Sequence, residues 1–297
     1  MRKSLLLSIS VFCASSLGAQ QPAPQTKLSV HWEELTAADF KDGIARAQGT
    51  CLLPFGILEK HGPHLPLGND LLNVRYVALN AAQQEYAVVF PEYYFGQIFE
   101  AKHQPGTVAY SRGLEFQLLQ ETTDEMARNG CKKIIIVNGH GGNNSLLPYF
   151  AQSQLESPHD YVVYVLGIAR GMAGQGPAHK SNPATDMHAG ESETSMSMVA
   201  RPDLVHLDRA TQESGADQAR LKDLPEDLYT GIWWYARFPN HYAGEGAAAT
   251  KELGEFEAKT WIAAIVQAIK AVKADQESLR LQNEFYERSK DPLKTPQ

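Results

Sequence analysis

Three short clusters of carboxylate and imidazole side chains stand out in this sequence of 297 residues. The first is Glu-Lys-His-Gly-Pro-His-Leu-Pro-Leu-Gly-Asn-Asp at residues 59–70. The second is Asn-Gly-His-Gly-Gly-Asn-Asn at residues 138–144, and the third is Asp-Met-His-Ala-Gly-Glu-Ser-Glu-Thr-Ser at residues 186–195. Carboxylates and imidazoles are the ligands that hold Zn²⁺, Mn²⁺ or Fe²⁺ in proteins. Their presence in three distant segments predicts one metal site assembled by the fold.

Local geometry favours metal binding in the first two clusters. Glu59 and His61 are two residues apart, so in an extended segment their side chains project to the same side. Asp70 follows a loop shaped by Gly and Pro, and His140 lies between glycines that allow a metal or substrate to approach the backbone closely. We expect a carboxylate of the third cluster to complete the ligand set.

Each cluster taken alone has a simpler explanation. A lone Glu-x-His sequence usually lies in a solvated loop. The Asn- and Gly-rich segment at residues 138–144 suits a tight turn, because both residue types tolerate positive φ. His188 alone suits a surface position or a helix start. The three clusters together, each at a predicted strand end or helix start, favour the metal site.

The elements around the clusters predict an α/β fold. Apolar runs at residues 50–58, 86–91, 133–137 and 161–166 predict four strands. Helices are predicted over residues 111–129 and 145–155 and from about residue 250 onward. On the first of these, the predicted apolar face is Leu114, Leu118, Thr122 and Met126. Alternation of strands and helices predicts a mostly parallel sheet covered on both faces, with ligands outside the carboxyl ends of its strands.

The three clusters resemble, in order, the signature motifs of the creatininase (creatinine amidohydrolase) family. The resemblance implies a three-layer α/β/α sandwich with a mostly parallel central sheet, assembled as a homo-oligomer, in many members a hexamer. It also implies two divalent metal ions, Zn²⁺ with Zn²⁺ or Mn²⁺, with Fe²⁺ as a further option. By resemblance, Glu59 and His140 hold one ion, His61 and a glutamate hold the other, and Asp70 bridges them.

One ligand departs from the pattern of creatininase itself. There, the glutamate lies two residues after the histidine of the second motif, where this chain has Gly142. We expect Glu193 to replace it, with Glu191 as the second choice. Gly141 also stands where creatininase has an aromatic residue beside the substrate, so creatinine is not the expected substrate.

The resemblance implies a metal-dependent amidohydrolase, in which a metal-activated water cleaves a C–N bond of a small cyclic amide or a formamide-type substrate. His188 is the expected acid that protonates the leaving nitrogen, Asp186 is expected to orient it, and Glu193 completes the candidate catalytic set. Alternatives are hydrolysis of a sugar-derived ring ketone or lactone, and peptide cleavage. A metal-binding protein without turnover is the alternative from another class; it would not need a general acid.

Composition and the N-terminus bound the location and the partners. Arg2 and Lys3, an apolar run and small residues predict a signal peptide at residues 1–20, then a flexible leader at 21–30 and a single domain at 31–297. We therefore expect an exported protein, periplasmic or secreted, that contacts no membrane after cleavage. The net charge of −7 and the absence of a basic run exclude non-specific nucleic-acid binding. The sequence contains no Gly-x-Ser-x-Gly motif, which would suggest a serine hydrolase. It also contains no Gly-x-Gly-x-x-Gly motif, which would suggest a nucleotide cofactor.

Two local questions stay open in the sequence. Cys51 and Cys131 each lie in or beside an apolar run, which predicts two buried thiols, with a disulfide as the alternative in an oxidising compartment. Aromatic residues at 233–235, together with His241, suit either a pocket wall or an oligomer interface. The interface is the favoured interpretation, because Trp and Tyr are enriched in interfaces.

Overall fold

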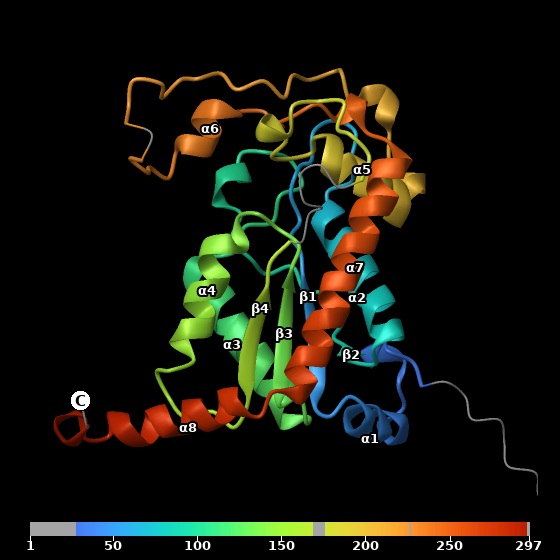
Figure 1. Ribbon diagram of the computed structural model, residues 1–297. Helices are drawn as coiled ribbons and strands as arrows, with labels where there is room; N and C mark the ends of the chain where they lie inside the picture. The colour runs from blue at the N-terminus through green and yellow to red at the C-terminus, as the bar shows by residue number, and fades with distance from the viewer. Residues whose placement is uncertain (1–27, 169–175, 226, 296–297) are drawn as a thin grey trace, which may run out of the picture.

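The computed structural model describes residues 28–168, 176–225 and 227–295. The predicted signal peptide and residues 21–27 of the predicted leader lie outside these ranges, and the domain boundaries stay a prediction. At the centre is an all-parallel sheet in the order β2-β1-β3-β4 (Figure 1). Its strands are β1 (Thr50–Phe55), β2 (Val88–Val89), β3 (Lys133–Asn138) and β4 (Val162–Leu166).

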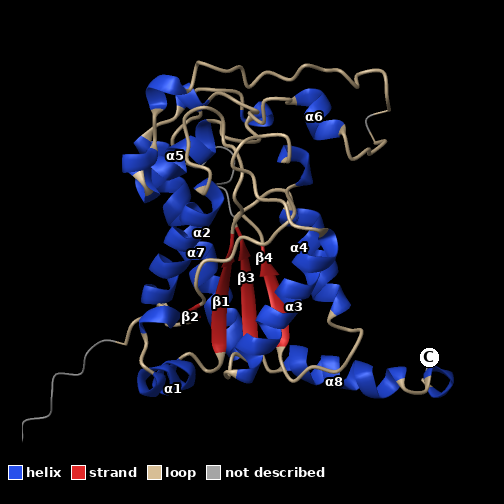
Figure 2. Cartoon of the chain, turned by 180° about the vertical axis from the view of Figure 1, so that it is seen from behind, coloured by secondary structure: helices blue, strands red, loops and turns tan. Residues whose placement is uncertain are grey.

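Helices cover both faces of this sheet, so the predicted three-layer sandwich is confirmed. The helices are α1 (Ala37–Arg46), α2 (Asn69–Gln84), α3 (Arg112–Arg128), α4 (Asn143–Ser153), α5 (Glu191–Ala200), α6 (Trp233–Arg237), α7 (Lys251–Ala274) and α8 (Glu277–Ser289). Helices α2 and α7 lie on one face, and α3 and α4 lie on the other (Figures 1 and 2). Short 3₁₀ turns are Trp32–Glu34, Phe99–Ala101, Pro183–Thr185, Pro202–Leu204, Leu207–Arg209, Gly246–Ala248 and Pro292–Lys294.

The core forms where the sheet meets these helices. Every residue of β1 is buried, and so are the apolar residues of β3, as expected for strands covered on both sides. Of the predicted apolar stripe on α7, Ile265, Val266, Ile269 and Val272 are buried, and Ile262 is half-buried. Among the described residues, no helix is both long and apolar enough to cross a membrane.

Several predicted boundaries were wrong. Strand β1 ends at Phe55 rather than at residue 58, and β2 is two residues long rather than six. The helix predicted from residue 145 begins at Asn143, and α1, α2 and α8 were not predicted. On α3, the buried face includes Leu119 and Thr123, whereas Leu114 is 41% exposed. Apolar residues at adjacent positions suit either face of a helix, so only packing on the sheet selects the buried one.

The buried face of α3 also carries a carboxyl group, which makes stability depend on pH. Glu115 is 2% exposed, and burial, with Glu100 nearby, raises its pKa to about 7 from an ordinary value of 4.5. The unfolded chain releases this proton first, so stability is lost as the pH rises between these two values. We expect Glu115→Gln to raise the free energy of unfolding by about 1–2 kcal/mol at about pH 8, and much less at about pH 4.5.

Urea unfolding at the two pH values measures this effect. Glu121→Gln, an exposed position on the same helix, is the matched control and should change stability equally little at both. An equal gain for Glu115→Gln at both pH values would show that burial does not perturb this carboxyl group.

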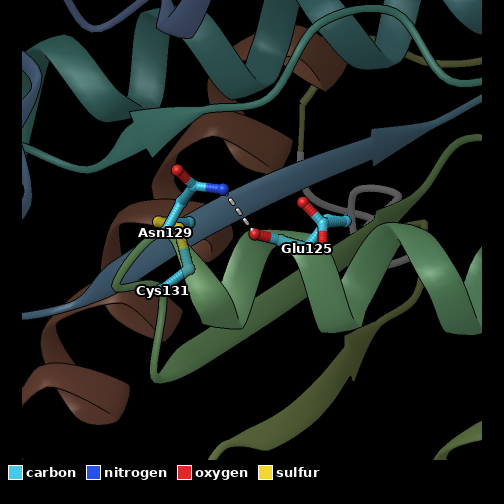
Figure 3. The surroundings of a disulfide bond; sticks show 4 residues. Glu125, Asn129 and Cys131 are labelled. Atoms are coloured by element: carbon cyan, nitrogen blue, oxygen red, sulfur yellow. Dashed lines mark hydrogen bonds between the residues drawn. A yellow bond between two sulfur atoms is a disulfide. The ribbon is translucent and has the colours of Figure 1, made fainter. Parts of the chain in front are cut away.

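Cys51 and Cys131 form a disulfide, so the expectation of two buried thiols was wrong. Cys131 follows α3 directly, and the turn at Gly130, whose φ is +101°, brings it over β1. Beside it, the Asn129 side-chain amide donates a hydrogen bond of 2.8 Å to the Glu125 carbonyl at the end of α3 (Figure 3). The resulting Cα–Cα distance of 5.6 Å suits a disulfide.

Removal of this disulfide is expected to destabilise the fold. The bond closes a loop with a sequence separation of 80 residues. A Cys51→Ala/Cys131→Ala variant should lose about 2–5 kcal/mol of unfolding free energy, since the unfolded chain is no longer constrained. Urea unfolding with and without a reductant tests this. The reductant should lower the stability of the wild type to that of the variant and leave the variant unchanged; a wild type that is insensitive to reduction would contradict the prediction.

Candidate metal centre

The three clusters come together at the carboxyl ends of the strands, at the end of the molecule where α5 and α6 lie (Figures 1 and 2). The first cluster follows β1 and ends in the first turn of α2, and the second follows β3 and leads into α4. The third leads into α5. This is the edge at which parallel α/β sheets bind ligands.

Close packing of α2 delivers Asp70 to this edge. Gly56 directly follows β1, and a Cβ there would lie 2.4 Å from the Leu71 Cα, so only glycine allows the first turn of α2 to approach. The Glu59 amide donates a hydrogen bond of 3.0 Å to the Leu67 carbonyl, which closes the loop between strand and helix. Asp70 therefore lies in the first turn of α2, directly after the predicted loop.

The Asp70 carboxylate lies between two imidazoles that come from different loops. Its Oδ1 is 2.9 Å from His61 Nε2, and its Oδ2 is 2.9 Å from His140 Nδ1. Each carboxylate oxygen thus faces a different ring. This is the arrangement expected of a carboxylate that bridges two cations.

Backbone carbonyls orient both imidazoles. His61 Nδ1–H donates to the Glu59 carbonyl at 3.2 Å, and His140 Nε2–H donates to the Gln97 carbonyl at 3.0 Å. The nitrogen atoms that face Asp70 are therefore the ones available to a metal. Donation of the second ring N–H to a carbonyl is typical of histidines that ligate metals.

The charges of the cluster also fit cations. Burial lowers the pKa of His61, but Asp70 and Glu59 outweigh burial and raise it to about 9. The pKa of His140 is likewise well above its ordinary value, because Glu59 and Asp70 outweigh burial. Burial raises the pKa of Glu59, yet His140 and His188 hold it well below its usual range. Without a metal, protons on imidazoles neutralise the carboxylates, and divalent cations can take their place.

Ligand atoms lie close enough to share an ion in two overlapping groups. The atoms of Glu59, Asp70 and His140 lie within 4.8 Å of one another, and so do those of Glu59, His61 and His188. Glu59 Oε1 is buried and makes no hydrogen bond within the described ranges, although His140 Nδ1 is 2.8 Å away. An acceptor left open in this way fits a metal ligand.

The third cluster separates the two glutamates considered as the last ligand. Glu193 Oε2 lies 3.9 Å from His61 Nε2 and accepts a hydrogen bond of 2.6 Å from the Ala189 amide. Glu191 instead accepts hydrogen bonds from the Lys180 and Ser181 amides, at 2.8 and 2.7 Å. Of the two glutamates, Glu193 is the one near the imidazoles.

The surroundings of Gly142 leave no room for a side chain. A Cβ at this position would lie 2.4 Å from His140 Nε2 and 2.5 Å from Gln97 Oε1. A glutamate therefore does not fit here in this structure. Of the histidine and glutamate that the second motif supplies in creatininase, this loop carries only the histidine, His140.

His188 lies over the cluster and is oriented differently from our expectation. Its Nε2–H donates to the Lys60 carbonyl at 2.8 Å, which leaves Nδ1 on the side of Glu193 Oε2, 3.8 Å away. Asp186 Oδ2 accepts a hydrogen bond of 3.0 Å from the Ser192 amide in the first turn of α5. The observed support of the His188 ring is thus a backbone carbonyl, and Asp186 holds the helix start that follows.

His241 reaches the centre, contrary to the interface interpretation. It is 2% exposed, and its Nε2 contacts Glu59 Oε2. Trp234 Nε1–H donates to His241 Nδ1 at 2.7 Å. Burial, and then His188, lower the pKa of His241 to about 4, so the neutral ring carries its one proton on Nε2 and donates it to Glu59. No spacing signal in residues 225–248 identified this histidine, because its partner lies far away in the sequence.

We expect His241→Gln to weaken metal binding about 10–100-fold, since Glu59 loses the donor that fixes its orientation. Competition with a chromophoric chelator measures the affinity. Trp234→Phe should weaken metal binding less. It removes the hydrogen bond that keeps the His241 proton on Nε2, but the imidazole ring stays in place. His159→Gln, a histidine that precedes β4 and whose Nδ1 lies 3.8 Å from Asp124 Oδ1, is the control. Equal affinities for His241→Gln and the control would contradict a positioning role.

Comparison with known proteins gives matches over most of the chain. The family model described as creatininase (creatinine amidohydrolase) matches residues 33–269. The chain is 26% identical over 258 residues to creatinine amidohydrolase of Pseudomonas putida, covering 82% of this chain and 96% of that protein. It is 33% identical over 176 residues to mycofactocin precursor peptide peptidase of Mycolicibacterium smegmatis, covering 57% of this chain and 65% of that protein.

Solved structures show the same fold. A creatininase variant of the Zn–Zn type aligns with a TM-score of 0.69 at 23% identity, covering 83% of this chain and 99% of that one. A creatininase described as the Mn form aligns with a TM-score of 0.66 at 23% identity, covering 83% and 100%. Structures of this fold thus occur with either metal.

Proposed function

This chain belongs to the creatininase family, and on that premise we propose that it is a metal-dependent hydrolase that cleaves a C–N bond of a small cyclic amide or a formamide-type substrate. The observation that carries the proposal is Asp70, whose two oxygens face His61 and His140 at 2.9 Å each. Relatives named for amide hydrolysis and for peptide cleavage support action on C–N bonds.

Two ligand sets share Asp70 in this proposal. Glu59, Asp70 and His140 would hold one cation, and His61, Asp70 and Glu193 would hold the other. Zn²⁺ in both sites, or Zn²⁺ with Mn²⁺, is supported by the metals of the related structures. When bound, such a pair would lower the pKa of a water molecule and polarise the substrate carbonyl.

The remaining residues orient groups and move a proton. The Lys60 carbonyl holds the His188 ring through Nε2, so Nδ1 is the atom that gives a proton to the leaving nitrogen. His241 holds Glu59 in place, and burial of the cluster keeps bulk water from its charges. Each role uses a hydrogen bond or contact made within the described ranges.

The N-terminal pattern and the disulfide support a proposal about location. Disulfides persist in oxidising compartments, and Cys51–Cys131 is buried in the core. We therefore propose export to the periplasm or the medium. Assembly into a homo-oligomer stays a prediction.

Metal analysis and a substrate panel test the proposed function. The mature protein, loaded with Zn²⁺ or Mn²⁺, is assayed against cyclic amides, N-formyl compounds, short peptides and lactones. We expect about two ions per chain and hydrolysis of at least one amide class, with activity lost on chelation and restored by metal. If the metal-loaded protein is inert on the whole panel, the better interpretation is that the chain binds metal without catalysing a reaction.

A further inference from the structure

A wide groove lies beside the metal centre. It has a volume of about 1050 Å³ and runs between α4 and the segment of residues 229–235 that contains the start of α6, with residues 97–103 forming another part of its wall. Figures 1 and 2 show α6 above α4 at the end of the molecule that carries the site. The groove is far larger than a small ring such as a cyclic amide needs.

Exposed apolar side chains gather in this groove. Tyr229 is 78% exposed, Tyr149 is 67% exposed and Ile232 is 55% exposed. Phe99 and Tyr235 line the same groove and are also exposed. Exposed apolar residues that cluster in one concave place mark a binding surface, since scattered ones need no explanation.

The groove adjoins the candidate metal centre through residues that neighbour His140. Gly141 and Gly142, which directly follow the expected ligand His140, form part of its wall. Gln97 lines it as well, and its carbonyl accepts the hydrogen bond from His140 Nε2. A molecule in the groove would therefore lie next to the loop that carries His140.

Helix α6 faces both places. Trp233 and Tyr235 line the groove, whereas Trp234 between them turns inward and donates to His241 beside Glu59. His103, from the opposite wall, lies edge-on to Tyr235 at 4.8 Å and bonds to the Pro239 carbonyl, which fixes α6 against residues 97–103. The same helix thus forms part of the groove wall and orients His241 beside the candidate metal ligand Glu59.

The groove also offers a positive charge. Lys102 is exposed at its wall and takes part in no ion pair within the described parts of the chain. The neighbouring carboxylate of Glu100 is engaged by Gln97 Nε2 at 2.7 Å. An aromatic surface with one available ammonium group is complementary to an apolar side chain that carries a carboxylate.

We propose that this groove is a substrate subsite, and that the substrate is an acyclic amide of an amino acid with an aromatic or branched apolar side chain and a free carboxylate. The scissile amide lies at the metal centre, the side chain lies against Tyr229 and Ile232, and the carboxylate lies near Lys102. Hydrolysis adds the hydroxyl group of water to the carbonyl carbon and a proton to the departing nitrogen, releasing an acid and a free amino acid. The inference rests on the proposed function, because it names the substrate of the same site.

N-formyl-L-tyrosine and N-formylglycine are a matched substrate pair that tests this subsite. With the metal-loaded protein, kcat/KM should be at least about tenfold higher for the tyrosine compound. Tyr229→Ala should reduce that ratio about fivefold or more, and Phe285→Ala, an exposed aromatic on α8, should leave it unchanged. Lys102→Ala should lower kcat/KM for N-formyl-L-tyrosine and leave that for N-formyl-L-tyrosinamide, which lacks the carboxylate, nearly unaffected.

Binding of an inert analogue separates failure of this inference from failure of the proposed function. N-methanesulfonyl-L-tyrosine cannot be hydrolysed as an amide, and calorimetry measures its affinity for wild type and Tyr229→Ala. Weaker binding by the variant, without hydrolysis of any cyclic amide, N-formyl compound or peptide of the panel, would support the binding groove and refute the function. Equal kcat/KM for the two N-formyl substrates, or a ratio unaffected by Tyr229→Ala, would overturn the subsite and leave the function standing. If light scattering shows that Tyr229→Ala changes the oligomeric state while substrate kinetics and analogue binding stay unchanged, the groove is a contact between copies of the chain. This result also overturns the subsite.

Discussion

Asp70→Asn is expected to bind fewer than one tight metal ion per chain and to lose at least about 10³-fold in kcat/KM. The amide keeps the shape of the side chain but offers one oxygen and one NH₂ group, and NH₂ does not ligate a cation. Since each carboxylate oxygen faces a different imidazole, one change affects both ligand sets. Metal content after gel filtration and steady-state kinetics measure the two effects.

The neighbouring position supplies the control. Asn69→Ala alters the start of α2 beside Asp70, and its side chain contacts Ser197 rather than the imidazoles. This variant should keep both ions, so loss of metal in Asp70→Asn cannot be assigned to a disturbed helix start. Two ions in Asp70→Asn at wild-type affinity would rule out bridging by this carboxylate.

His188→Gln is expected to keep both ions and to lower kcat about 10²–10⁴-fold, because the leaving nitrogen loses its proton donor. The loss should shrink for nitroanilide substrates, whose leaving nitrogen carries a stabilised negative charge and depends less on a proton donor. His159→Gln, at the other end of the sheet beside Asp124, should not show this dependence on the leaving group.

His188→Gln also decides between two roles for His188. Its ring also belongs to a possible ligand group with Glu59 and His61. Loss of one ion in His188→Gln, with a uniform drop for all leaving groups, would make it a ligand and refute its role as the acid.

The sequence was informative about the site because its chemistry is concentrated in short segments. Glu59, His61 and His140 each follow a predicted strand, and the general rule for parallel sheets brings such residues together. Glu193 was already expected ahead of Glu191 as the last ligand. The structure adds a physical distinction, because both lie in the first turn of α5 but accept hydrogen bonds from different amides. Whether these side chains hold metal stays a prediction.

Features that depend on distant contacts could not be predicted. His241 is separated from Glu59 by 182 residues, and no local pattern marks it. The disulfide depends on a turn after α3 that brings Cys131 to β1. Helix α2 was missed because its first turn contains the polar end of the first motif, which is typical of a loop when read without its packing on β1.

Anomalous diffraction from crystals grown with Zn²⁺ and with Mn²⁺ tests the central claim most directly. We predict two anomalous peaks, one on each side of the Asp70 carboxylate, the first within ligand distance of Glu59 and His140 and the second within that distance of His61 and Glu193. A single peak, no peak at saturating metal, or Asp70 turned away from both imidazoles would contradict the account.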